Sequence, residues 1–418
     1  MLLNLRKILG SFVLVLMLGG VLRAAEDNCR TCHFDFEDEG GPAHLIMRDI
    51  HIQNGLGCFD CHGGDPSLDD MDDVRGSSGY RGVPNHGGVP AFCARCHSDA
   101  VYMRQHDPSL PTDQLDKYKT SVHGRLLFDK KDGKVANCVS CHGVHQIGDA
   151  KMPHSSTHPA NIAETCGHCH SDRDYMAEYG IPTSQVDDYR QSVHGIALLE
   201  RNDLGAPSCN DCHGNHGAAP PGVSSLSAVC GNCHALEADL FDGSPHKEAF
   251  EENDFPMCET CHSNHKIVKP SDALIGTQES SLCADCHSAD DGTIAFVTAE
   301  SVSEAITALA AAHGQADSIL GEAILKGMMT TDEEFRLKEV AQALIQSRTK
   351  VHAFNADSVL ASTQDGIEKA DLVRINSAAL IEEYYFRRKG LGLATIFITL
   401  LAIALYIKVR KLDRRPKA

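Results

Sequence analysis

All 18 cysteines of the chain fall into units of the form Cys-x-x-Cys-His, and none is left over. Any fold must bring these thiols and imidazoles to whatever they bind, so the units constrain the structure more than any other feature. There are nine of them: Cys29-Cys32-His33, Cys58-Cys61-His62, Cys93-Cys96-His97, Cys138-Cys141-His142, Cys166-Cys169-His170, Cys209-Cys212-His213, Cys230-Cys233-His234, Cys258-Cys261-His262 and Cys283-Cys286-His287.

The spacing within each unit has a chemical reason. Two thiols three positions apart can form thioethers with the two vinyl groups of one haem, and the next residue, a histidine, then lies under the iron as its proximal ligand. A single Cys-x-x-Cys pair could instead be a zinc half-site, a redox dithiol or a disulfide. A zinc site does not require the following histidine, yet all nine pairs have it in a chain with only 24 histidines. The sequence therefore predicts nine covalently bound haem c groups, with all 18 cysteines as thioether donors and all nine motif histidines as iron ligands.

Composition agrees with a core built from cofactors. The chain has no tryptophan, and aromatic residues make up only 6% of it, so porphyrins would fill much of the interior. The closely spaced units would place neighbouring macrocycles in contact or nearly so, which allows electrons to hop between them. The formal net charge of -19 argues against nucleic acid as a partner, because phosphate binding needs a basic surface.

Three stretches of the chain repeat one pattern, which predicts an internal two-haem module. Each has a free histidine 12 to 15 residues before a C-x-x-C-H-x-x-H sequence, and a second C-x-x-C-H unit follows. A histidine that recurs in such a module is most simply the second, distal ligand of a haem iron, often of a neighbouring haem. The alternative is an exposed or hydrogen-bonded core residue. The six free histidines are His123, His145, His194, His216, His246 and His265.

Six further histidines are candidate distal ligands. His44 and His51 precede Cys58 by 14 and seven residues, and His86 and His106 flank the third unit. His313 and His352 fall on or beside an apolar stripe, where a lone histidine is usually a hydrogen-bonded core residue. They could also reach the haem domain as ligands and dock the two parts together.

The N-terminus predicts a secretory signal peptide over residues 1–25. Arg6 and Lys7 form a basic start, Ile8 to Leu22 is an apolar stretch, and Ala24 and Ala25 offer a cleavage site. The alternative is an uncleaved N-terminal anchor, although the apolar stretch is short for a membrane span.

The C-terminus predicts a single transmembrane helix over residues 390–407, which contain no charge. The tail, residues 408–418, is strongly basic, and the positive-inside rule places it in the cytoplasm. The sequence therefore predicts an inner-membrane protein with its haem domain in the periplasm and membrane lipid around its span.

The predicted fold is mainly α with extensive irregular loops. Residues 26–292 would form a nine-haem cytochrome c domain, and residues 293–389, which lack cysteine, a helical hairpin or bundle that serves as a stalk. Within the stalk, a capping box at Ser301–Glu304 would open the first helix and one at Thr331–Glu334 the second, with a break at Gly327. The second helix would run through Val359. The third helix would start near Ile367 and continue into the membrane span.

The doubled motifs, with SVHG before CHGVH and CHGNH, resemble the bacterial multihaem cytochromes c of respiratory chains. The resemblance covers about residues 26–292. It implies a role in anaerobic respiration, in which electrons come from a membrane quinol-oxidising subunit or the quinol pool and leave to a periplasmic redox protein or reductase. The well-known quinol dehydrogenases of this type have an N-terminal anchor and four or five haems. The C-terminal span and nine units of this chain favour a membrane partner subunit over direct quinol oxidation, and they leave an oligomer open.

The leading functional prediction is an electron carrier without catalytic residues, in which two histidines bind each iron. Such irons have no open position, and their potentials are low because no methionine ligand raises them. The alternative is a reductase or oxidase of a small nitrogen or sulfur compound at one five-coordinate haem. No unit has lysine in place of its histidine, so the first haem, at Cys29, Cys32 and His33, is the candidate for that site. A purely structural haem protein or haem store is a third reading, which the number of ordered cofactors disfavours.

Overall fold

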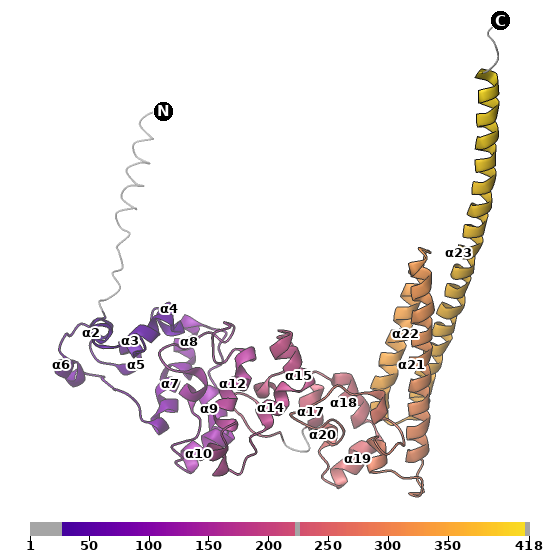
Figure 1. Cartoon of the computed structure of the whole chain (residues 1–418). Coiled ribbons are helices and arrows are strands. Elements are labelled where there is room, and N and C mark those ends of the chain that lie inside the picture. The colour runs from indigo at the N-terminus through magenta and orange to yellow at the C-terminus, as the bar shows by residue number, and fades with distance from the viewer. Residues whose placement is uncertain (1–26, 222–225, 414–418) are drawn as a thin grey trace, which may run out of the picture. The chain divides into compact units, whose positions relative to one another are not determined.

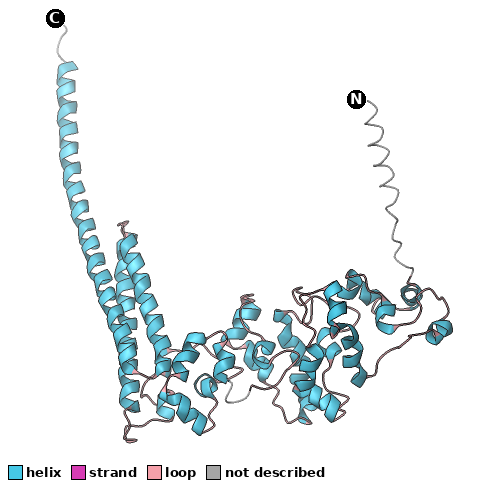
Figure 2. Cartoon of the chain, turned by 180° about the vertical axis from the view of Figure 1, so that it is seen from behind, coloured by secondary structure: helices cyan, strands magenta, loops and turns pink. Residues whose placement is uncertain are grey.

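The computed structural model describes residues 27–221 and 226–413, and the predicted signal peptide lies outside them. The described residues are mainly helical and contain no strand, as Figure 2 shows, which confirms the predicted fold class. The chain divides into two compact units. Unit 1 comprises the described residues up to Pro220 together with His265–Ile267, and unit 2 comprises Pro221–Asn264 and the chain from Val268 onward.

Unit 1 consists of short helices joined by irregular loops, and it holds the first six motifs. Its longest helix has only 12 residues, because glycine, proline and N-capping residues interrupt the chain at short intervals. The α-helices are α2 (Asn28–Phe36), α3 (Pro42–Leu45), α4 (Ile50–Gln53), α5 (Cys58–His62), α6 (Met71–Gly76), α7 (Val89–His97), α8 (Ala100–His106), α9 (Gln114–Thr120), α10 (Val122–Asp129), α11 (Cys138–His142), α12 (Pro159–His170), α13 (Arg173–Ala177), α14 (Gln185–Arg190), α15 (Val193–Gly195) and α16 (Cys209–His213). Single turns lie at η1 (Ile46–Arg48), η2 (His86–Gly88) and η3 (Ile196–Glu200).

Unit 2 joins the last three motifs to the helical bundle. The motif-bearing part is again made of short elements: α17 (Leu226–Gly231), α18 (Ala235–Asp242), α19 (Pro245–Glu252), α20 (Met257–His262), η5 (Asp272–Leu274) and η6 (Cys283–Asp285). The bundle follows as α21 (Ala295–Leu325), α22 (Thr331–Lys350), the turn η7 (Val351–Ala353) and α23 (Ala356–Asp413). The division by compactness therefore falls near residue 220, whereas the functional boundary near residue 292 stays a prediction.

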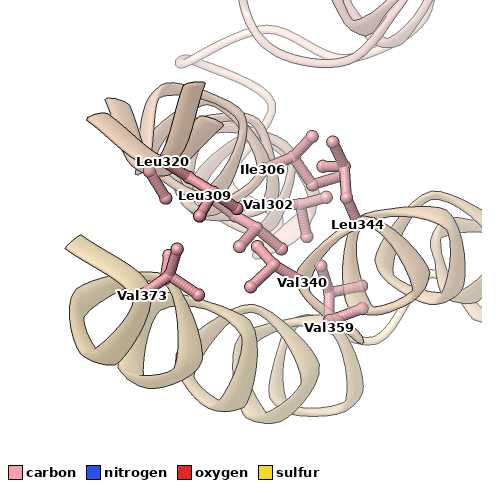
Figure 3. Packing of buried hydrophobic residues seen from close by; sticks show 11 residues of the cluster. Val302, Ile306, Leu309, Leu320, Val340, Leu344, Val359 and Val373 are labelled. Carbon is pink, nitrogen blue, oxygen red and sulfur yellow. The ribbon is translucent and has the colours of Figure 1, made fainter. Parts of the chain in front are cut away.

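The three bundle helices pack through one apolar core. On α21, buried residues recur at spacings of three and four, from Val302 through Ile306 and Leu309, so they line one face of the helix. Figure 3 shows these side chains pointing toward Val340 and Leu344 of α22 and toward Val359 and Val373 of α23. The core explains why these helices are long and continuous, since tertiary packing of an amphipathic face supplies most helical stability.

The helix boundaries of the bundle correct the sequence prediction. The break near Gly327 is confirmed, but α21 begins at Ala295, so the box at Ser301–Glu304 lies inside the helix. The cap of α22 is Thr330, whose Oγ1 bonds Glu334 Oε1 at 2.6 Å, one residue before the predicted box. The second helix ends at Lys350 rather than running through Val359, and the third starts at Ala356 rather than near Ile367.

Helix α23 is long and apolar enough to cross a membrane. It continues without a break from the bundle into the apolar run 390–407, where all side chains are exposed. Figure 1 shows it extending well beyond the ends of α21 and α22. Helix α21 passes the same test of length and composition, but its apolar face is buried in the bundle core.

Candidate haem sites

Three of the motifs open a one-turn helix whose ends are fixed by local chemistry. In α5, α11 and α16 the residue after the motif histidine is a glycine with φ between 70° and 77°, a left-handed conformation that ends the helix at once. At the other end, the residue before the second cysteine bonds back to the N-cap: Asp60 Oδ2 accepts from the Gly57 N–H and Asp211 Oδ2 from the Ser208 N–H, each at 2.7 Å. The recurring CHG sequence thus has a structural cause.

The other motifs are built differently. In α7 and α12 the unit forms the last turn of a longer helix, which ends at His97 and His170. In the module of Cys138 and Cys166, therefore, the first motif starts a helix and the second ends one. The two motifs of that module therefore hold their thiols in different helical contexts, although their sequences are alike.

The stretches before the first units form a second repeated structure. Tyr118 and Tyr189 each donate a hydrogen bond to the carbonyl oxygen two residues before the next cysteine, at 2.7 and 2.9 Å. Three residues on, Ser121 and Ser192 are buried and their hydroxyls bond the tyrosine carbonyl at 2.6 and 2.7 Å. A Cβ at Gly124 would lie 1.8 Å from the Tyr118 carbonyl oxygen, so only glycine fits after the histidine. The SVHG sequence thus fixes His123 and His194 relative to the following motif.

The third module reaches the same arrangement with an apolar contact. Phe241 replaces the tyrosine, and Ser244 bonds its carbonyl at 2.7 Å as the other serines do. Without a phenol hydroxyl, Phe241 packs on Met257, which directly precedes Cys258 and is 1% exposed. His246 of this module is therefore held by packing, with the Phe354 ring 3.7 Å from its own.

At least seven motif histidines lie ring to ring with a histidine from outside the motifs, at centroid distances of 5.8 to 6.2 Å. Metal–imidazole bonds are about 2 Å long, so two imidazoles on opposite sides of one metal ion have centroids roughly 6 Å apart. Each pair leaves the space that one iron would take. The pairs are His97 with His51, His62 with His145, His170 with His123, His142 with His216, His213 with His265, His287 with His246 and His262 with His352.

Hydrogen bonds at Nδ1 orient several of these rings so that Nε2 is left for a metal. His62 Nδ1 bonds the Gly82 carbonyl at 2.9 Å, and His352 Nδ1 bonds the Thr349 carbonyl at 2.9 Å. His51 Nδ1 instead bonds Asp49 Oδ1 at 2.7 Å. Such partners are typical of metal-ligating histidines, because they fix the tautomer and the ring direction.

Burial favours the neutral form of four of the paired rings, which is the form that binds a metal. Desolvation of the half-buried rings, and after it the partner imidazole, lower the pKa values of His123, His142 and His262 below the ordinary value. The pKa of His170 is lowered by desolvation and then by the imidazole of His213. Burial alone would raise the pKa of Asp49, but hydrogen bonds from His51 and from the Ile147 N–H outweigh it and lower that pKa. Asp49 is thus a buried carboxylate held as an anion against His51.

Other candidate histidines have different surroundings. His44 Nε2 bonds the Glu37 carbonyl at 3.1 Å, and His86 Nε2 bonds the Val135 carbonyl at 2.8 Å, so the structure uses those nitrogens elsewhere. The His106 ring stacks on Tyr102 at 4.7 Å, and His313 lies half-buried on α21. His194 lies on α15 in the same local frame as His123.

The first motif differs from the rest. His33 Nδ1 bonds Glu37 Oε1 at 2.7 Å, and its side chain is 48% exposed. Among the residues that the structure describes, no histidine ring is paired with His33. Glu37 and Asp49 are functional candidates that sequence reasoning missed. Both are acidic residues two or four positions from a candidate histidine, which is a signal too common in this acidic chain to single them out.

Three pairs of successive motifs have thiols close enough to raise the pKa of one member. The neighbouring thiols are Cys138 beside Cys93, Cys209 beside Cys166 and Cys258 beside Cys230. No group of three or more His, Cys, Asp and Glu side chains converges on a metal position within the described part of the chain. Pairs of imidazoles beside pairs of thiols instead fit a haem, whose porphyrin supplies the other four iron ligands.

Comparison with known proteins agrees with this chemistry. The family model of the doubled CXXCH motif matches residues 246–292, which contain the third module. No curated protein matches the chain. The match supports a multihaem protein of the cytochrome c type, a class that binds haem covalently and transfers electrons. Because c-type haem is attached outside the cytoplasm, the motif region is extracytoplasmic.

Proposed function

We propose that this protein passes electrons through a chain of nine haem c groups between a membrane quinol-oxidising partner and a periplasmic redox protein or reductase. Helix α23 would anchor it in the inner membrane, with the haems in the periplasm. The observation that carries the proposal is the set of seven histidine pairs at 5.8 to 6.2 Å, each with one motif histidine.

In these pairs the motif histidine would be the proximal ligand and its partner the distal one. His51, His123, His145, His216, His246, His265 and His352 are thus proposed as distal ligands, and His194 as another, from its SVHG frame. An iron with two imidazoles has no vacant position, so it exchanges electrons but does not bind substrate. The acidic chain further stabilises the oxidised, more positive iron.

The neighbouring thiols support a continuous path. Each thioether lies at the edge of its porphyrin, so contacts such as Cys93 with Cys138 and Cys166 with Cys209 would bring haem edges close together. Short edge-to-edge distances favour hopping along consecutive haems in the order of the sequence.

The stalk supports a partner subunit rather than direct quinol oxidation. His352 lies just before α23, and the helix from Ala356 to Gly390 is about 50 Å long at a rise of ~1.5 Å per residue. The haem paired with His262 and His352 would therefore lie about 50 Å along the stalk from the start of the apolar run. Electrons do not cross such a distance through protein in one step. A redox partner that stands beside the stalk would bridge it.

A pair of histidine variants tests the ligand assignment. In the His216→Ala holoprotein, we expect one iron to change from low-spin to high-spin in the electron paramagnetic resonance spectrum, because the haem of His142 loses its distal ligand. The matched control, His106→Ala, removes a histidine that stacks on Tyr102 and should leave every iron low-spin. Identical spectra for the two variants would contradict the assignment.

A second candidate function rests on the first motif. Its proximal His33 has no histidine opposite it among the described residues, and the carboxylate of Glu37 on Nδ1 makes the imidazole a more basic ligand. That arrangement suits an iron that binds and reduces a small nitrogen or sulfur compound.

Carbon monoxide binding decides between the two. The enzyme hypothesis predicts one high-spin iron and one bound carbon monoxide per reduced protein, lost in the Cys29→Ser/Cys32→Ser variant but kept in Cys209→Ser/Cys212→Ser. If every iron is low-spin and none binds carbon monoxide, the enzyme hypothesis is wrong and only the electron-transfer function is left.

A further inference from the structure

The turn that joins α21 to α22 has large apolar side chains that are exposed to solvent. Leu325 and Met329 are each 89% exposed, and Phe335 on the first turns of α22 is 66% exposed. We call the segment Leu325–Phe335 the hairpin tip. Hairpin turns in water are usually polar, so exposed apolar residues clustered at one end of a bundle indicate a surface that another phase or molecule covers.

The hairpin tip lies at a defined height on α23. Lys326 Nζ is 5.5 Å from the centre of the Tyr384 ring and 5.1 Å from that of Tyr385. Figure 1 shows α21 and α22 ending at this part of α23. From Tyr384 to Gly390, the first residue of the apolar run, α23 rises about 9 Å. The polar layer on each side of a bilayer core is on the order of 5–8 Å thick. The hairpin tip therefore lies at about the outer edge of that layer if the run spans the core.

The residues of α23 beside the hairpin tip have the chemistry of a membrane interface. The rings of Tyr384 and Tyr385 lie 5.3 Å apart, and the 79% exposed Phe386 follows them. Three basic residues come directly after, at 387–389. Arg388 Nη1 donates to the Tyr384 hydroxyl at 2.8 Å. Tyrosine and basic side chains gather where headgroups meet acyl chains, because one end of each is apolar and the other is wet.

Three acidic residues near the hairpin tip have partners within the bundle. Glu333 is turned inward and accepts from Arg336 Nη1 at 2.7 and 2.8 Å and from Asn376 Nδ2 at 2.9 Å. Glu334 bonds Thr330, and Glu322 pairs with Lys326 at 3.0 Å. Leu325 and Met329 face outward at the turn itself, while the exposed Asp332 lies on the first turn of α22.

We propose that the hairpin tip rests on the periplasmic lipid surface, with Leu325 and Met329 in contact with the lipid headgroups. The proposal rests on the membrane span proposed above for residues 390–407. It continues the apolar and aromatic surface of α23 onto a second element. A lone transmembrane helix tilts over a range of about 0–40°. A second contact beside it would hold the stalk upright and so fix the height of the haem next to His352.

Site-directed spin labelling tests the contact with lipid directly. All native cysteines of the holoprotein would be thioethers, so an introduced cysteine is the one free thiol. Three variants of the full-length holoprotein in phospholipid nanodiscs are labelled with a nitroxide: Met329→Cys at the hairpin tip, Leu393→Cys in the apolar run and Ile345→Cys on α22. Ile345 is 55% exposed and lies about 24 Å further along the bundle, so it is the aqueous reference.

We expect collision with a water-soluble nickel chelate to be several-fold weaker at Met329→Cys than at Ile345→Cys, and weakest at Leu393→Cys. Adding Leu325→Glu should raise the chelate accessibility of the Met329→Cys label and leave Leu393→Cys unchanged. If Leu393→Cys is protected while Met329→Cys is as accessible as Ile345→Cys, the hairpin tip does not touch lipid and the proposal is wrong. If Leu393→Cys is itself accessible, the span fails and the hairpin tip fails with it. Protection of Met329→Cys in native membranes but not in nanodiscs would assign the surface to a protein partner and also overturn the proposal.

Discussion

The motif region and the bundle of this chain are stabilised in opposite ways. The bundle has an apolar core of 11 buried residues shared by three long helices, whereas the largest buried apolar cluster of unit 1 has four, at Ala163, Val186, Tyr189 and Leu198. Helices of the motif region have at most 12 residues, and α23 alone has 58. Short helices are marginal without packing partners. The difference indicates that haem supplies the core of the motif region, while the bundle folds on its own side chains.

The largest expected effect comes from withholding haem. In protein produced without covalent haem attachment, we expect α21 and α22 to stay protected from amide hydrogen exchange, while α7, α12 and the other motif helices exchange as unfolded chain. The reason is that the bundle keeps its core and the motif region loses its own. If the motif helices are protected from exchange without haem, haem does not supply the core of the motif region.

A large-to-small substitution in the bundle should act on the bundle alone. Ile306 is 0% exposed, so Ile306→Ala should lower the free energy of unfolding of the bundle by about 2–5 kcal/mol. Urea unfolding followed by far-ultraviolet circular dichroism measures it, with the exposed Ile345→Ala as control. The haem absorption spectrum should not change, since Ile306 packs within the core of the bundle. An equal decrease in the free energy of unfolding in both variants would show that the buried core does not stabilise the bundle.

In the motif region, we expect charge rather than packing to set a haem property. Asp49→Asn should raise the potential of the haem bound by His97 and His51, because the buried carboxylate no longer stabilises the ferric iron through His51 Nδ1. An ionic hydrogen bond is worth about 1.5–3 kcal/mol, which corresponds to an upward shift on the order of 60 mV or more. Spectroelectrochemical titration measures it, and the exposed Asp107→Asn is the control. If no haem potential changes, the Asp49 carboxylate does not influence that iron.

The smallest expected effect is the loss of one tether. Tyr118→Phe removes the hydrogen bond to the Ala136 carbonyl and should cost about 0.5–1.5 kcal/mol of local stability. The third module already tolerates phenylalanine at the equivalent Phe241, so haem attachment should persist. Local hydrogen exchange around residue 136 measures the change against the exposed Tyr80→Phe. Loss of a haem would show that the tether is needed for assembly.

Much of the site could be predicted from the sequence because covalent haem attachment depends on short, local spacing. The Cys-x-x-Cys-His units and the recurring free histidines can be recognised in the sequence without knowledge of the fold. The structure places most of those histidines beside a motif histidine. His44 and His51 could not be separated in advance. The structure turns His51 toward His97 because Asp49 caps α4 and bonds the ring, while His44 bonds a carbonyl. The Asp49 carboxylate also accepts a hydrogen bond from the N–H of Ile147, a residue far along the chain, so the orientation of His51 depends on the tertiary fold.

Helix boundaries were predicted less well, for a physical reason. A capping box marks a sequence that can start a helix, but Ser301 lies within α21 because half-buried residues before it, such as Phe296 and Ala299, extend the packed face of the helix. The third helix starts earlier than predicted because Val359 packs into the core at 0% exposure, and only the fold shows that contact. The continuity of α23 into the apolar run agrees with the prediction.

Intact mass spectrometry of the purified mature protein tests the central claim most directly. The account predicts the mass of the polypeptide plus nine haems that survive denaturation and acid extraction. A polypeptide without covalent haem, or one that carries zinc at its thiols instead, would contradict it.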